Sequence, residues 1–212
     1  EMEIIDTAEI QKREPHVSKE AVGIYIVPNK LIRMILVVVT ALGTVLLPRI
    51  TNCLKNKDYD NYNSYMNISL NYIFFIALPL AVSTFLLSDD IINIMAGSQF
   101  IASTLTLKIL SPILFTIGIA YFLGFQLLYP LGLEKYYTYS VIVAAIVNFI
   151  FNYLMIPKYL QNGAAIGTVV AETVGPLIML FFAREHIKKI SFFSKKRLKY
   201  FGATFIMSLI II

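Results

Sequence analysis

The sequence predicts an all-α protein: a polytopic bundle of transmembrane helices with about five complete spans, a truncated sixth and a short interfacial helix. Of its 212 residues, 58% are hydrophobic and only 15% are charged, and the mean hydropathy is +0.72. Soluble domains average about 45–50% apolar and about 25% charged residues, so lipid is the expected solvent for this surface. Stretches without charge at 61–88, 109–133 and 136–157 each exceed the roughly 20 residues that cross a bilayer as a helix.

The chain is expected to divide into a polar external segment at 1–21 and a partial C-terminal transmembrane bundle at 22–212. The spans are expected at about 22–47, 65–88, 106–129, 137–157, 163–183 and 200–212, with an interfacial helix at about 90–104. The chain begins with Glu1 and ends inside the apolar run Met207–Ile212, which we interpret as a fragment cut at both ends.

The loops after the first, third and fifth spans contain most of the lysines and arginines of the bundle. They include Arg49, Lys55, Lys57 and Lys135, together with a basic cluster at 184–199. Positive charge favours the cytoplasmic side, so these loops are predicted to lie in the cytoplasm.

Two cations near the start of the first span, Lys30 and Arg33, are the candidate substrate-binding residues. They lie three residues apart, hence on neighbouring positions of a helix. On a cavity wall they would suit a diphosphate, because arginine holds phosphate oxygens in a bidentate fork and lysine adds a point charge. The alternative is that both side chains extend to external lipid headgroups.

Polar residues in the fourth and fifth spans are candidates for a cavity or for coupling to an ion. Glu172 lies in the middle of a span, where a carboxylate is costly unless it is paired, protonated or hydrated. It could couple a proton or sodium ion, contact a sugar, or serve a structural hydrogen bond. Asn148 and Asn152 share one helical face and could line a cavity or bond to a neighbouring helix.

Small residues recur every four positions in the fifth span. The stripe consists of Gly163, Gly167, Ala171 and Gly175. A face of small side chains lets another helix approach closely, so the stripe predicts helix packing.

We find no pattern that predicts enzymatic chemistry, a metal site or a cofactor. The single cysteine, Cys53, excludes an intrachain disulfide and a CxxC metal motif. A Gly-rich phosphate loop and an acidic diphosphate motif are also absent from the sequence. The net charge of +5 is concentrated between apolar runs, which indicates membrane lipids rather than nucleic acid as the partner.

Three stretches resemble the polysaccharide flippase branch of the multidrug/oligosaccharidyl-lipid/polysaccharide exporter superfamily. They are Val22–Tyr25 with Ala41–Arg49; Ile91–Gly97 with Phe100 and Leu107–Leu110; and Asn148–Tyr159 with Gly163–Thr168 and Ala171–Glu172. The third is the most specific, through its asparagines, its Ile-Pro-Lys-Tyr sequence and its Gly-Ala-Ala sequence. The polar segment at the front departs from the family pattern.

The resemblance implies the second half of a two-bundle transporter of the cytoplasmic membrane, whose N-terminal bundle is missing from this chain. It also implies alternating access, with an undecaprenyl-diphosphate-linked oligosaccharide as the substrate and the polysaccharide polymerase machinery as a further partner. In the related lipid II flippases, cavity arginines face the diphosphate, and Lys30 and Arg33 fall in a corresponding region. The alternatives are a cation-coupled multidrug exporter or a lipid II flippase of the same superfamily. A membrane polysaccharide polymerase or ligase would need a longer loop between spans.

Overall fold

The computed structural model describes residues 19–187, 190 and 194–211, and every element within these residues is a helix. In chain order the helices are α2 (Lys19–Lys55), α3 (Tyr59–Leu86), α4 (Ser88–Met95), η1 (Ser98–Ser103), α5 (Thr104–Leu110), α6 (Ile113–Tyr121), η2 (Phe122–Leu128), α7 (Glu134–Ile187) and α8 (Lys195–Ile211). The expected polar segment at 1–21 lies almost entirely outside the described residues.

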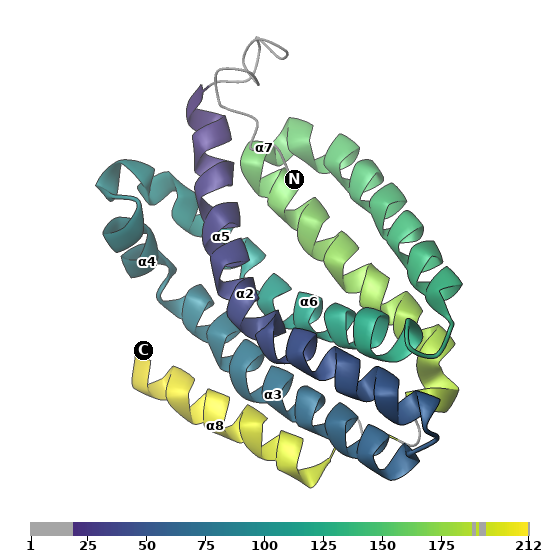
Figure 1. Ribbon diagram of the computed structural model, residues 1–212. Coiled ribbons are helices and arrows are strands. Elements are labelled where there is room, and N and C mark those ends of the chain that lie inside the picture. The colour runs from purple at the N-terminus through teal and green to yellow at the C-terminus, as the bar shows by residue number, and fades with distance from the viewer. Residues whose placement is uncertain (1–18, 188–189, 191–193, 212) are drawn as a thin grey trace.

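The predicted fold class, a bundle of transmembrane helices, is confirmed. Among the described residues, α2, α3 and α7 are long and apolar enough to cross a membrane, and a bent pair running from Ser98 to Leu128 passes the same test. In Figure 1, α3 lies between α2 and α8, and α7 packs on the other side of α2.

Helix α7 is a hairpin of two antiparallel arms rather than one rod. The chain reverses at Leu160, which has a positive φ of 50° and a ψ of −127°. Figure 1 shows the two arms side by side, joined at the top. The arms cover the two spans expected at 137–157 and 163–183, and the turn between them is shorter than the sequence interpretation allowed.

The third expected span, 106–129, is broken. Helix α5 ends before Ser111 and Pro112, and α6 starts at Ile113, with a bend of 44° between the two parts. Proline has no amide hydrogen and clashes with the preceding turn, which explains the break. Beyond α6 the helix widens into the π-helical turn η2.

The interfacial helix expected at 90–104 is also divided. Gly97, with a φ of 92°, separates α4 from the 3₁₀ turn η1. The left-handed backbone conformation at this position favours glycine over any other residue.

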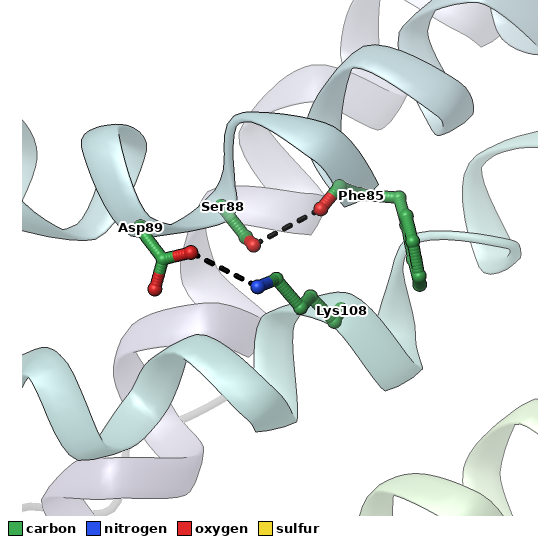
Figure 2. A network of polar contacts seen from close by, with 4 residues as sticks. All are labelled: Phe85, Ser88, Asp89 and Lys108. Carbon is green, nitrogen blue, oxygen red and sulfur yellow. Dashed lines mark hydrogen bonds and ion pairs between the residues drawn. The ribbon is translucent and has the colours of Figure 1, made fainter. Parts of the chain in front are cut away.

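Polar contacts hold the ends of the helices. At the start of α3, Asp58 accepts hydrogen bonds from the side chain (2.6 Å) and the backbone amide (3.2 Å) of Asn61. These bonds keep the pKa of the Asp58 carboxyl below its ordinary value. Figure 2 shows the other end of α3, where Ser88 donates to the Phe85 carbonyl.

An ion pair joins α4 to α5. Lys108 Nζ lies 2.9 Å from Asp89 Oδ2 (Figure 2). The hydrogen bond from Lys108 lowers the pKa of the Asp89 carboxyl from its usual value. Both side chains are accessible, so the contact orients the short helix rather than contributing much stability.

The basic loops gather at one end of the bundle. Figure 1 shows the α2–α3 turn and both ends of the α7 hairpin together at the lower right. This arrangement brings Lys55, Lys57 and Lys135 to the same end as Arg184, which agrees with the topology expected from the sequence.

The outer surface of the bundle is strongly apolar. Val37, Phe149 and Ile210 are 68%, 73% and 80% exposed. Such side chains fit a lipid environment, where burial of apolar groups between helices gains little and close packing holds helices together.

Candidate functional site

A cavity of about 640 Å³ lies between α2, α6, η2 and both arms of α7. Each helix contributes one face to it, at spacings of three or four residues. It is bounded by Tyr25, Asn29, Arg33, Ile117, Ala120, Tyr121, Phe125, Tyr137, Val141, Ala144, Ala145, Asn148, Thr168, Ala171, Glu172, Gly175, Pro176 and Met179. Most of these residues are apolar, with a few polar groups among them, as is usual for a ligand cavity.

The face of α2 that lines the cavity consists of Tyr25, Asn29 and Arg33, spaced four residues apart. Arg33 is exposed on the cavity wall. Lys30 is also exposed but does not line the cavity, so the structure separates the two cations that the sequence paired. A binding role for Lys30 stays a prediction.

Glu172 lies on the second arm of α7, opposite Arg33 and half-buried in the cavity wall. Arg33 is near enough to act electrostatically on Glu172, and Glu172 acts in turn on Tyr137. Among the described residues, however, no ion pair within 4 Å joins Arg33 to an acidic side chain. The guanidinium therefore keeps its donors available to a ligand.

The two candidate asparagines differ in position. Asn148 lines the cavity, whereas Asn152 does not. Asn152 Nδ2 donates to Asn148 Oδ1 at 2.9 Å, and the side-chain oxygen Oδ1 of Asn152 lies against Gly167. Asn152 thus orients the amide of Asn148 while it packs between the α7 arms.

The stripe of small residues lies at the contact between the arms of α7. A Cβ added at Gly163 would meet the backbone of Met155 and would come within 2.8 Å of the Ile156 nitrogen. At Gly175 the nearest atom is the Cβ of Ala144, at 3.7 Å. The arms are therefore closest near the turn and farther apart toward the cavity, where Ala171 and Gly175 form part of the wall.

Sequence reasoning missed the contribution of Tyr25, whose hydroxyl lies 3.2 Å from Thr168 Oγ1. Because Thr168 gives its own proton to the Ala164 carbonyl, Tyr25 is the donor in this contact. The bond joins α2 to the second arm of α7. The spacing of Tyr25, Asn29 and Arg33 was the signal that could have identified this face.

Among the described residues there is no group of three or more His, Cys, Asp or Glu side chains that could hold a metal ion. The cavity instead presents one cation, one carboxylate, two amides and several aromatic rings within apolar walls. Together with the membrane-spanning helices, this cavity defines the chain as part of a polytopic membrane protein with an internal polar site.

Comparison with known proteins identifies the family. Residues 21–212 match the family model described as lipid II flippase MurJ. The chain is 30% identical over 158 residues to a probable lipid II flippase of Rhizobium tropici, covering 71% of this chain and 30% of that protein. It is 26% identical over 176 residues to the lipid II flippase of Bacillus subtilis, covering 79% and 30% respectively. An uncharacterized membrane protein of Methanocaldococcus jannaschii is 29% identical over 161 residues, covering 74% and 30%.

The chain belongs to the lipid II flippase MurJ family. The matched region spans about 30% of the length of these relatives. The predicted location, a multi-pass protein of the cytoplasmic membrane, is confirmed by this membership and by the apolar helices. The sequence interpretation placed a polysaccharide repeat-unit flippase first, and the comparisons favour its alternative, a lipid II flippase, instead.

Proposed function

We propose that the whole protein is a transporter, not an enzyme, that moves lipid II from the inner to the outer leaflet of the cytoplasmic membrane. Family membership supports the class of substrate, a polyprenyl diphosphate that carries sugars. The rest of the cavity would come from the part of the protein that this chain does not include, as expected for the missing N-terminal bundle.

The observation that carries the proposal is the position of Arg33. Its guanidinium is exposed on the wall of the cavity, with no described carboxylate within 4 Å. A planar guanidinium binds phosphate oxygens through two parallel hydrogen bonds, so Arg33 is the residue we assign to the diphosphate. Asn29, one turn earlier on the same face, is placed to add an amide hydrogen bond.

The acidic and amide groups opposite Arg33 complete the proposed site. Glu172 and Asn148 lie on the two arms of α7 and offer acceptors and a donor for hydroxyl and amide groups of a glycan. We propose that Glu172 also limits anion binding at Arg33 until a diphosphate competes for the guanidinium. Lys30, outside the cavity wall, is assigned to the headgroups of membrane lipids.

The test uses the full-length gene in a host depleted of its own lipid II flippase. Lipid II that has reached the outer leaflet is measured on intact protoplasts with a membrane-impermeant sugar-cleaving enzyme. Arg33→Ala is expected to reduce flipping about tenfold to a hundredfold, since a hydrogen bond to a charged group contributes about 1.5–3 kcal/mol. Arg33→Lys keeps the charge but not the bidentate geometry, so its flipping rate is expected to lie between those of the wild type and Arg33→Ala.

Lys30→Ala is the matched control, because it removes a cation of the same helix outside the cavity. If the wild-type protein leaves lipid II on the inner side, the proposal is wrong. If cells without the protein instead accumulate lipid-linked oligosaccharide repeat units on the inner side, the protein is a polysaccharide flippase. A change in drug resistance alone would indicate a multidrug exporter.

A further inference from the structure

An aromatic ladder runs along one wall of the cavity. We define it by Tyr121, Phe125, Tyr129 and Tyr137. The ring centroids of Tyr121 and Phe125 lie 5.1 Å apart, and those of Phe125 and Tyr129 lie 5.4 Å apart with nearly parallel planes, at 6°. Tyr137, from the first arm of α7, contacts both Phe125 and Tyr129 at 5.4 and 5.3 Å.

The backbone builds this ladder for a local reason. Tyr121, Phe125 and Tyr129 are four residues apart along the end of α6 and through η2, so they share one helical face. Gly124 leaves room for the ring of Tyr137, which lies within 2.6 Å of the position a Cβ would occupy there. Any larger residue at Gly124 would push this ring out of the ladder.

The ladder is accessible from the cavity. Tyr121, Phe125 and Tyr137 line it, and Tyr129 extends the row beyond the cavity. Although the rings pack against one another, Phe125 is still 36% exposed and Tyr129 is 45% exposed. These partly exposed rings differ from the lipid-facing aromatics of the bundle, because hydrogen-bonding side chains line the same cavity.

We propose that the aromatic ladder is a stacking track for the sugar rings of the lipid-linked substrate. The face of an aromatic ring has a negative quadrupole, which attracts the weakly positive C–H groups on the flat face of a sugar. Asn148, Thr168 and Glu172 in the same cavity supply hydrogen bonds to the hydroxyl and amide groups at the edge of that sugar. Successive rings are spaced on the scale of single sugar units.

This inference rests on the proposed function and assigns a second part of the substrate to the site. Arg33 would hold the diphosphate, and the ladder would hold the sugars. The two roles predict different losses of affinity when the sugar is removed from the lipid.

The experiment uses the full-length protein in nanodiscs and measures affinity for two probes: lipid II, and a polyprenyl diphosphate without sugar. Phe125→Leu is expected to weaken binding of lipid II about threefold to tenfold, the scale of one aromatic contact, and to change binding of the sugarless lipid less than twofold. Arg33→Ala is expected to weaken binding of both lipids. Phe125→Tyr, which keeps the ring, is expected to bind both lipids as the wild type does.

Phe85→Leu is the matched control, since it removes an exposed aromatic ring of α3 outside the cavity. Equal losses for both lipids in Phe125→Leu, or no loss for either, would overturn the stacking proposal, because a structural role or none would then explain the ring.

If the wild type binds neither lipid, the proposed function fails, and a free disaccharide becomes the probe. If the protein binds that disaccharide and Phe125→Leu weakens the binding, the stacking proposal stands. If the protein does not bind the disaccharide, the stacking proposal is overturned. Binding of a cationic drug that depends on Phe125, with no sugar binding, would also overturn it.

Discussion

The close contact between the arms of α7 allows a matched pair of substitutions with opposite expected effects. Gly163→Ala places a methyl group against the Met155 backbone and within 2.8 Å of the Ile156 nitrogen, and backbone atoms cannot rotate away. Overpacking costs about 1–3 kcal/mol, and we expect the upper end here because the contact is with backbone. Alanine favours the helix over glycine by up to about 1 kcal/mol, so the net loss in the free energy of unfolding is about 2 kcal/mol.

Gly175→Ala, in the same stripe, is the control. Its added methyl would lie 3.7 Å from Ala144 Cβ, an ordinary van der Waals distance. We therefore expect no loss, or a gain of up to about 1 kcal/mol from helix propensity. The two variants should differ by about 3 kcal/mol, which corresponds to several degrees in Tm.

The assay is the thermal unfolding of the full-length protein in detergent, followed at one scan rate for the wild type and both variants. The expected order of Tm is Gly163→Ala below the wild type, and Gly175→Ala at or above it. Equal Tm values for the two variants would refute the close packing of the α7 arms at the turn.

Two further predictions concern charge. Glu172→Gln is expected to tighten binding of a polyprenyl diphosphate about threefold to tenfold by removing a negative charge that acts on Arg33. A threefold to tenfold change corresponds to about 0.6–1.4 kcal/mol, the scale expected for two charges that a hydrated cavity screens; unchanged or weaker binding would contradict this reasoning. The lowered pKa of Asp89 means that its contact with Lys108 is fully present above the ordinary carboxyl pKa of 3.8 and is lost as the pH falls below it. A spin label at Ser98→Cys should therefore gain mobility only as the pH falls below 3.8 when Asp89 is present, whereas the label in the Asp89→Asn variant should be mobile at every pH; identical profiles would exclude the ion pair as the cause.

The helical class of the fold could be predicted from the sequence because charge is excluded from long stretches of it. The stretches 61–88 and 136–157 correspond to α3 and to most of the first arm of α7. The breaks were harder to place. Pro112 is visible in the sequence, but a proline alone does not determine how far a helix bends, because neighbouring groups can supply the replacement hydrogen bonds.

The candidate site was predicted only in part, for a geometrical reason. Residues three apart on a helix differ by about 60° around its axis, so Lys30 and Arg33 can share a face or be separated by a small rotation. The packing of α2 against α6 and α7 decides that rotation, and the sequence of α2 alone does not contain it. Arg33, Glu172 and Asn148 came together at the cavity, whereas Lys30 and Asn152 did not.

The aromatic ladder was not predicted because it combines two elements. The spacing of Tyr121, Phe125 and Tyr129 is visible in the sequence, but aromatic residues near the ends of spans are equally typical of an interfacial belt. Tyr137 completes the ladder only after the turn before α7 returns the chain to η2. The space at Gly124 that admits its ring is a property of the packed structure.

The tight reversal at Leu160 has a mechanical consequence. Because the two arms of α7 touch through backbone near Gly163, they are held together at the turn, whereas their cavity-facing residues beyond it are packed less closely. The cavity is thus bounded on one side by a hairpin that is held at its turn, and on another by α6 and the π-helical turn η2.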